Sequence, residues 1–375
     1  MGENLLEKVI INALQYKKDS SGIGVMIREL FSRYASMSDY PCEIVLCRDI
    51  GDFPADGKTS FHFAPCGYEQ GLRRMFYQLF ELGRRCDNAL LLTTDAKTPL
   101  FMPRSCRVIP LVTDLALYRM PEAYQSSRVL LWKLQYRYLR RRACRFLAIS
   151  EFTKHEITEI LDVPQEKIDV VPCACSEQMR RVTDQQKLWA IREAYQIPER
   201  FVLFVGNTNP RKNLKRIIQA FDEVKEQGFP HQLIIAGGQG WKFNRESVLS
   251  DIYHKEAVRF IGFVPDEDMP ALYSAADVFL FPTLYEGFGI PVLEAQQCGT
   301  PVLTSNGSSL PEVGGDGALY VDPYSVEDIA KGLRCLLEDR ELAAALVKKG
   351  YRNAERYSWR AAAEKLNKIV VEEFR

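Results

Sequence analysis

The chain has 375 residues, a length at which two domains can each bury a core of their own. Apolar residues make up 46% and charged residues 26% of the chain, which is typical of a globular protein and excludes a disordered one. Lys and Arg together number 49, and so do Asp and Glu, so the net charge is zero, which argues against bulk electrostatic binding of nucleic acid. No apolar run reaches the roughly 18–20 residues that span a bilayer.

Short apolar runs rich in Val, Ile and Phe alternate with helical patterns, which is typical of parallel α/β architecture. In the first half we predict strands at 9–14, 42–47, 61–65, 89–94, 107–112, 146–150 and 168–172. In the second half we predict strands at 201–206, 232–238, 258–264, 278–283, 301–306 and 318–323. One intervening helix has a single apolar face, made of Leu214, Ile217, Ile218, Phe221 and Val224.

The strand rhythm lapses into a polar stretch between about 173 and 198. We therefore predict an N-terminal Rossmann-like domain at 1–175 and a C-terminal one at 198–355, followed by a helix over 356–375 that packs back on the N-terminal domain. Ligands of open α/β sheets bind beyond the carboxyl ends of the strands, so we expect a cleft between the two facing rims.

The first candidate site follows a strand that ends at Gly206. Asn209 and Pro210 suit the N-cap and the first position of the next helix. Arg211 and Lys212 would then lie in its first turn, where two cations are unfavourable by about 0.3–1 kcal/mol each unless a polyanion is bound. Helix N–H groups, a guanidinium and an ammonium suit a phosphate or diphosphate. The alternative is a solvated pair of cations.

The second candidate site is EGFGIPVLE, from Glu286 to Glu294. Glu286 follows a strand and precedes a flexible loop whose backbone can approach a ligand closely. Pro291 suits the first position of the next helix, so Glu294 would lie in or near the first turn, where a carboxylate is favoured. Glu294 can also accept two hydrogen bonds from the vicinal diol of a ribose. For Glu294 alone, the alternative is a helix N-terminal charge.

These two elements and the segment PVLTSNGSSLPEVGGDGALYVDP (301–323) resemble the retaining GT-B-fold glycosyltransferases of family 4. In the first half, Gly22 and Gly24 of SSGIGVMIREL resemble the first Gly-rich turn of that family. FLAISEFTKHEI (146–157) resembles its S-x-x-T-K element, and PEAY at 121–124 has counterparts there. The resemblance covers nearly the whole chain, and its C-terminal motifs are the more specific.

The resemblance implies metal-independent transfer of a hexosyl or 6-deoxyhexosyl unit, with retention, from a nucleoside-diphosphate sugar to a glycan or lipid-linked acceptor. It implies a mannosyl-, rhamnosyl- or glucosyltransferase of polysaccharide or glycolipid biosynthesis that uses no cofactor. Arg211 and Lys212 would stabilise the departing diphosphate, Glu286 would hold donor-sugar hydroxyls, and Glu294 would hold the ribose. The donor-binding residues would be Gly22, Gly24, Gly206, Gly287, Phe288, Gly289, Ile290 and Glu294.

One position departs from the family pattern. Thr113-Asp114 stands where the family commonly has His-Asp, a His thought to contact the donor sugar near its 6-position. Either the donor is a 6-deoxy sugar such as rhamnose, or the chain is a catalytically silent sugar-nucleotide-binding partner of another glycosyltransferase. Thr113, Asp114 and Ser150 are the candidates next to the acceptor and the sugar.

Two other functions have weaker support in the sequence. Asp266-Glu267-Asp268 matches a D-x-D metal motif, but it opens a predicted helix, so we interpret it as N-terminal acidic capping and predict no metal site. Gly22-Ile23-Gly24 lacks the third glycine of a dinucleotide-binding turn, which argues against a nicotinamide-dependent oxidoreductase.

The stretch 128–145 interleaves Leu, Trp and Tyr with the cations Arg128, Lys133, Arg137, Arg140, Arg141, Arg142 and Arg145. One interpretation is docking on an anionic membrane that carries a lipid-linked acceptor. The other is a solvated helix whose inner side packs on the sheet. The ten cysteines form no C-x-x-C pair, which predicts reduced thiols and a cytoplasmic protein, either dissolved or peripheral on the inner face of the membrane.

Overall fold

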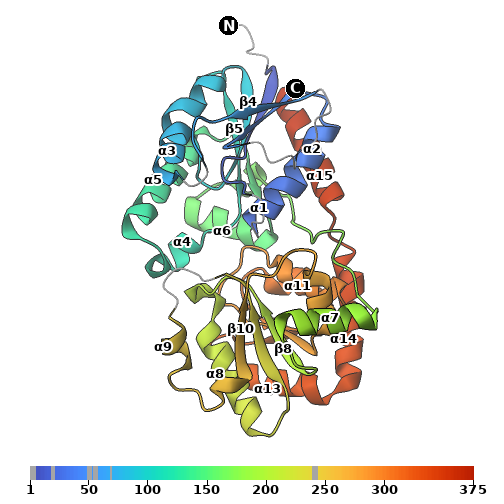
Figure 1. The fold of residues 1–375 in the computed structure, drawn as a ribbon. Helices are drawn as coiled ribbons and strands as arrows, with labels where there is room; N and C mark the ends of the chain where they lie inside the picture. Colours follow the sequence, from blue (N-terminus) through green and yellow to red (C-terminus); the bar gives the residue numbers. More distant parts are fainter. Residues whose placement is uncertain (1–5, 18–21, 49–52, 54–57, 68–69, 239–243) are drawn as a thin grey trace. The chain divides into compact units, whose positions relative to one another are not determined.

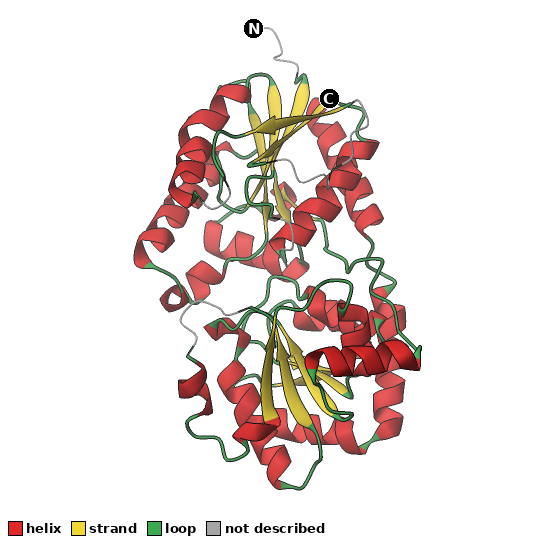
Figure 2. Ribbon diagram, viewed as in Figure 1, coloured by secondary structure: helices red, strands yellow, loops and turns green. Residues whose placement is uncertain are grey.

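The computed structural model describes residues 6–17, 22–48, 53, 58–67, 70–238 and 244–375. Ser20 and Ser21, which begin the predicted Gly-rich turn, lie outside these residues. The chain divides into one unit of Met1–Cys173 with Ser358–Arg375 and a second unit of Ala174–Tyr357. Each unit is built on its own parallel sheet, which confirms the predicted α/β class with two Rossmann-like domains (Figures 1 and 2).

The first unit has a seven-stranded sheet in the order β3-β2-β1-β4-β5-β6-β7, with every neighbouring pair parallel. Its strands are β1 (Lys8–Asn12), β2 (Cys42–Leu46), β3 (Thr59–Phe63), β4 (Ala89–Thr94), β5 (Arg107–Val112), β6 (Phe146–Ala148) and β7 (Ile168–Val170). All residues of β2 and β4 are buried, as expected for strands covered on both faces.

Helices cover both faces of this sheet, with α3 and α5 on one side and α2 and α15 on the other (Figure 1). The helices are α1 (Ile23–Met26), α2 (Ser32–Met37), α3 (Gly71–Phe76), α4 (Ala116–Arg119), α5 (Ser126–Arg142), α6 (Glu151–Leu161) and α15 (Trp359–Phe374). A π-helical turn, Ile27–Phe31, joins α1 to α2, and Tyr77–Glu81 continues α3 in the same way.

The second unit has a six-stranded parallel sheet in the order β10-β9-β8-β11-β12-β13. Its strands are β8 (Phe201–Val205), β9 (Gln232–Ala236), β10 (Val258–Gly262), β11 (Val278–Phe281), β12 (Val302–Ser305) and β13 (Leu319–Val321). Its helices are α7 (Gln185–Tyr195), α8 (Leu214–Glu226), α9 (Arg245–Leu249), α10 (Met269–Ala275), α11 (Ile290–Gln297), α12 (Leu310–Gly314), α13 (Val326–Glu338) and α14 (Arg340–Ala354). The apolar face predicted for α8 is buried at all five positions.

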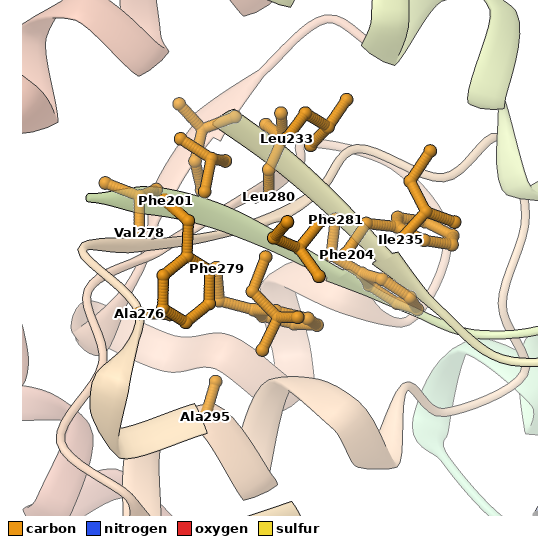
Figure 3. Packing of buried hydrophobic residues seen from close by; sticks show 14 of the residues in the cluster. Phe201, Phe204, Leu233, Ile235, Ala276, Val278, Phe279, Leu280, Phe281 and Ala295 are labelled. Carbon is orange, nitrogen blue, oxygen red and sulfur yellow. The ribbon is translucent and has the colours of Figure 1, made fainter. Parts of the chain in front are cut away.

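Aromatic rings on the central strands form much of the second unit's core (Figure 3). The ring of Phe281 lies 5.9 Å from that of Phe204 and 5.3 Å from that of Phe279. Because Phe281 is the last residue of β11, this core reaches the carboxyl end of the sheet. The loops that leave β8 and β11 therefore start from a rigid base.

The chain's last helix belongs to the first unit. α15 packs against α2 and against the π-helical turn Ile27–Phe31. At the C-terminal end of α15, Glu372 and Glu373 form ion pairs with Arg145. The division between the units falls after Cys173, so α7 belongs to the second unit, whereas the sequence left 176–197 outside both predicted domains. No helix among the described residues has both the length and the apolar character that crossing a membrane requires.

The strand order of each sheet reverses at one point. In the first unit this switch lies between β1 and β4, and in the second between β8 and β11. Ligands of open α/β sheets bind outside the carboxyl ends of the strands at such a point. The residues that follow these four strands are therefore the candidates for function.

Candidate functional site

In the second unit, Arg211 and Lys212 follow β8 in a single 3-10 turn, Pro210–Lys212, ahead of α8. The prediction that they occupy the first turn of the helix is wrong. Asn213, at a φ of 61°, adopts the left-handed conformation, so the chain turns there and α8 begins only at Leu214. The two cations thus lie beside the helix start, and the carboxyl edge of the sheet positions them.

The Asn213 side chain fastens this turn to the sheet. Its amide donates hydrogen bonds to the carbonyl oxygens of Pro282, 2.9 Å away, and Pro323, 2.7 Å away. These carbonyls follow β11 and β13, so one buried residue ties three loops together. Sequence reasoning missed this role, although Asn213 directly follows the two cations and Asn is one of the few residues that tolerate the left-handed region.

Replacing Asn213 with Ala is expected to lower the free energy of unfolding by about 3 kcal/mol, from two lost buried hydrogen bonds and about 1 kcal/mol of backbone strain. Asn213→Gly removes the same hydrogen bonds without the strain, so it should lose about 1 kcal/mol less. Urea unfolding of both variants measures the difference. Equal losses in the two variants would contradict the backbone contribution.

The two cations meet the Glu286 carboxylate from β11's loop. Arg211 Nη1 lies 2.9 Å from Oε2 of Glu286, and Lys212 Nζ lies 2.7 Å from Oε1. Burial alone would raise the pKa of Glu286, but the two cations outweigh it and hold that pKa below its usual value. Together these three side chains carry a net charge of +1, which suits an anionic ligand.

The surroundings of Lys212 fix its ammonium. Nζ lies 4.6 Å from the centre of the Phe281 ring, so a cation–π interaction with the aromatic core stabilises it. Gly206 has a φ of 149°, a conformation that side chains rarely adopt, and a Cβ there would be in ordinary van der Waals contact with Lys212 Cε at 3.4 Å. A Cβ on Gly237 would come within 2.2 Å of the Gly206 carbonyl oxygen, so the chain approaches itself closely here. Sequence reasoning had not singled out Gly237.

The loop from Glu286 to Gly289 is held by two serines of the segment 301–323. The Glu286 N–H donates to Ser308 Oγ at 3.2 Å, and Ser309 Oγ donates to the carbonyls of Glu286 and Phe288 at 2.9 and 2.7 Å. Gly289 has a φ of 104°, and a Cβ on it would lie 2.6 Å from the side chain of Leu310. No described residue accepts a hydrogen bond from the N–H of Phe288 or Gly289.

α11 begins at Ile290, so Pro291 is its second residue rather than its first and Glu294 lies just past the first turn. Tyr273 donates its hydroxyl hydrogen to Glu294 Oε2 at 2.8 Å, whereas no described residue donates to Oε1. Burial raises the pKa of Glu294 to about 7. A partly exposed carboxylate with one oxygen oriented and the other available suits a diol. The sequence contained no signal for Tyr273.

In the first unit, the Thr113 side chain is engaged by Asp95. The N–H and the hydroxyl of Thr113 both donate to Asp95 Oδ1, at 2.9 and 2.6 Å. Asp114 Oδ1 accepts from the N–H of Ala116 at 3.0 Å, which stabilises the start of α4. Asp95 had not been predicted as a site residue, although it directly follows a predicted strand.

The remaining predicted residues of the first unit lie at helix starts. Ser150 is fully buried and caps α6, because its Oγ accepts from the N–H of Thr153 at 3.0 Å. Gly22 precedes α1 with a φ of 67°, a conformation that favours glycine, and Gly24 is a buried residue of α1. Contacts of these residues with a donor or an acceptor stay predictions.

The acidic run Asp266-Glu267-Asp268 lies in the turn that leads into α10 and ends at its N-cap residue, Asp268. The helix therefore begins three residues later than predicted, and the Asp268 side chain makes no capping hydrogen bond to it. Pro270 occupies the second helical position, where its missing N–H costs no hydrogen bond. Asp268 accepts from the hydroxyl of Tyr195 at 2.7 Å. Over the described ranges, no three or more His, Cys, Asp and Glu side chains are grouped in a way that could hold a metal ion.

Comparisons with known proteins bear on this geometry. The family model described as "Glycosyl transferases group 1" matches residues 188–353, which contain Arg211, Lys212, Glu286 and Glu294. The O-antigen chain mannosyltransferase B of Escherichia coli is 33% identical over 262 residues, 68% of this chain and 67% of that protein. The serotype-specific mannosyltransferase WbdA of Escherichia coli is 30% identical over 224 residues, 58% of this chain but 27% of that protein.

A solved structure has a similar fold over almost the whole chain. The structure of Anabaena Alr3699/HepE in complex with UDP-glucose matches with a TM-score of 0.76, over 97% of this chain and 99% of that chain. The sequence identity is 15%, so this likeness shows a shared fold.

Proposed function

The chain belongs to the group 1 glycosyl transferases, and we propose on this basis that it transfers a hexosyl or 6-deoxyhexosyl unit from a nucleoside-diphosphate sugar to a glycan or lipid-linked acceptor in polysaccharide or glycolipid biosynthesis. Mannose is the first sugar to test, because two relatives are named as mannosyltransferases. Rhamnose is the alternative, because Thr113 replaces the family's His and its hydroxyl is already bound to Asp95. We further propose that the reaction retains the anomeric configuration.

The observation that carries the proposal is the ion-paired group of Arg211, Lys212 and Glu286 at the switch point of the second sheet. A nucleoside diphosphate gains negative charge as the sugar leaves it. Cations that are already fixed stabilise this charge without the cost of reorienting. Glu286 stays ionised between them and sets their positions before the donor arrives.

The other groups of this site suit the remaining parts of the donor. The N–H groups of Phe288 and Gly289, at the start of α11, can donate to phosphate oxygens or sugar hydroxyls. Glu294 would accept from the ribose diol through Oε1 while Tyr273 holds Oε2. The same proposal includes two further sets of contacts. Glu286 contacts donor-sugar hydroxyls, and Gly22 and Gly24 contact the donor.

The acceptor side includes peripheral membrane contact through 128–145. α5 buries Gln135, Tyr136 and Leu139, while Leu130 and Leu134 are exposed. An exposed apolar pair among arginines suits the headgroup region of an anionic bilayer. This supports a lipid-linked acceptor.

A thermal-shift panel of UDP, GDP and dTDP with their hexose and 6-deoxyhexose sugars tests the donor. A ligand at 100 times its Kd should add about 2.7 kcal/mol to the free energy of unfolding. Stabilisation by one nucleotide series, followed by sugar transfer, supports the enzyme. Stabilisation without transfer to glycolipid acceptors would favour the silent binding partner, and no stabilisation by any of the panel would contradict the donor site.

Transfer is expected to continue at an unchanged rate in excess EDTA, because Arg211 and Lys212 supply the positive charge at the diphosphate. The measurement compares initial rates after dialysis against EDTA with rates after adding back Mg²⁺ or Mn²⁺. Loss of transfer in EDTA that either ion restores would contradict a metal-independent reaction.

A further inference from the structure

The loop that follows β11 contacts the residue at which the second unit ends. In this loop, 286–289, the ring of Phe288 lies 5.5 Å from the ring of Tyr357 at an interplanar angle of 87°, an edge-to-face pair. Aromatic pairs of this geometry attract each other beyond the area that they bury, so the pair resists displacement of either ring. Tyr357 is the last residue of the second unit, and sequence reasoning had not singled it out.

The Tyr357 side chain is itself fixed to α12. Its hydroxyl donates to the carbonyl oxygen of Glu312 at 3.0 Å. α12 follows Ser308 and Ser309, the two serines that hold the backbone of the loop 286–289. The aromatic ring of the loop and its backbone are therefore both fixed to one short helix and the turn before it.

α14 gives Tyr357 a rigid base, because buried side chains join this helix to α11 and α12. Asn353, near the end of α14, donates to Oε1 of Gln296 in α11 at 2.9 Å and to the carbonyl oxygen of Val313 in α12 at 2.7 Å. Asn353 and Gln296 are both buried. α11 is the helix that the loop 286–289 leads into, and it packs directly against α14 (Figure 1). The segment that carries Tyr357 is thus fixed to the same two helices as the loop.

The sequence of the loop explains why its ring needs such a partner. Phe288 lies between Gly287 and Gly289, two residues that restrict the backbone very little. Phe288 is 3% exposed and its ring packs on Tyr357, so a ligand contact from this residue comes from its backbone. A backbone N–H binds a phosphate oxygen well only when it points almost straight at it, because hydrogen bonds weaken steeply with misalignment. The buried ring therefore helps to fix the direction of that N–H.

We propose that Tyr357 is a positioning residue for the diphosphate of the donor. Through the ring of Phe288, it holds the N–H groups of Phe288 and Gly289 in the direction that phosphate oxygens require. This role rests on the proposed function, in which the diphosphate binds at the loop 286–289. It goes beyond that function because it makes the affinity for the diphosphate depend on a side chain that does not touch the ligand.

Binding of inorganic pyrophosphate tests this role, measured by isothermal titration calorimetry on the full chain. Tyr357→Leu removes the ring and should weaken binding about tenfold or more, as expected when one hydrogen bond to a charged group is lost. Tyr357→Phe keeps the ring against Phe288, so its affinity should stay within about threefold of that of the unmodified chain. Tyr253→Leu is the matched control, because Tyr253 is 82% exposed in the same unit, and its affinity should be unchanged.

Phe288→Leu tests the same contact from the loop, so the role remains testable if Tyr357→Leu fails to fold. This variant keeps its backbone N–H and should lose about as much affinity as Tyr357→Leu. A variant with both substitutions should lose no more than either single one, because both remove the same contact. Losses that multiply in the double variant would overturn the proposal, as would a loss in Tyr253→Leu equal to that in Tyr357→Leu.

Leu346→Ala separates positioning from stability, because it removes a buried side chain of α14. It should lower the unfolding temperature and leave the affinity of the folded chain for pyrophosphate unchanged. A loss of affinity as large as that in Tyr357→Leu would mean that the Tyr357 ring serves the fold alone, and would reject the positioning role.

The donor site and this role fail in different ways. If a nucleoside diphosphate stabilises the unmodified chain and Tyr357→Leu binds pyrophosphate with unchanged affinity, the donor site stands and the role of Tyr357 is rejected. If neither pyrophosphate nor UDP, GDP or dTDP binds to the unmodified chain, the donor site is rejected and this role with it.

Discussion

Lys212→Ala is expected to lower kcat by about 100- to 1000-fold, the range seen when one preorganised stabilising group is removed from a developing charge. The ammonium is buried, lies 2.7 Å from Glu286 and is supported by the Phe281 ring, so water cannot take over its position cheaply. Without it the site loses its net positive charge, because Arg211 alone then balances Glu286. The measurement is the initial rate of transfer per folded molecule, with folding followed by circular dichroism.

Lys215→Ala is the matched control, since Lys215 is an exposed residue of α8 and should keep its full rate. Arg211→Ala should lower kcat as well. If the Lys212 variant unfolds while its remaining folded fraction transfers sugar at the normal rate, then Lys212 serves the fold and not the reaction.

The sheets were predictable because each of their strands is a short apolar run between polar segments. Strands that are buried on both faces show this pattern directly, and all thirteen predicted runs became strands of the two sheets. The strand ends also indicated where to look, since Arg211, Lys212 and Glu286 all follow predicted strands. The direct contact among these three was not predictable, because it joins residues about 75 positions apart.

Local backbone geometry was harder to predict from the sequence than the topology of the sheets. The pattern NPRKNL suits a helix that starts at Pro210, and only the hydrogen bonds of Asn213 to Pro282 and Pro323 explain why the helix starts later. Tyr273 belongs to a helix pattern with no motif of its own. Its importance comes from a long-range partner, Glu294, which no local pattern contains.

The ionised carboxylate of Glu294 is expected to strengthen nucleotide binding and to lower the stability of the fold. Burial raises its pKa from 4.5 to about 7, so between these values the folded chain holds a proton that the unfolded chain has released. The contribution of this group to stability is therefore fully present below pH 4.5 and is lost as the pH rises through 7. Glu294→Gln is expected to raise the free energy of unfolding at pH 8 by about 1–3 kcal/mol, with little change at pH 5.

The same substitution should weaken binding of the nucleotide about 10- to 100-fold at pH 8, because the ribose diol loses a charged acceptor. In the unmodified chain the affinity should fall by up to about tenfold for each pH unit below 7, as the carboxylate takes up its proton. Calorimetric titrations between pH 5.5 and 8 measure this slope, and the Gln variant reports the part that comes from the nucleotide's own phosphates. If affinity depends on pH equally in the two proteins, Glu294 does not bind the ribose. If Glu294→Gln gains stability at pH 8 without losing affinity, the Glu294 carboxylate does not contact the nucleotide.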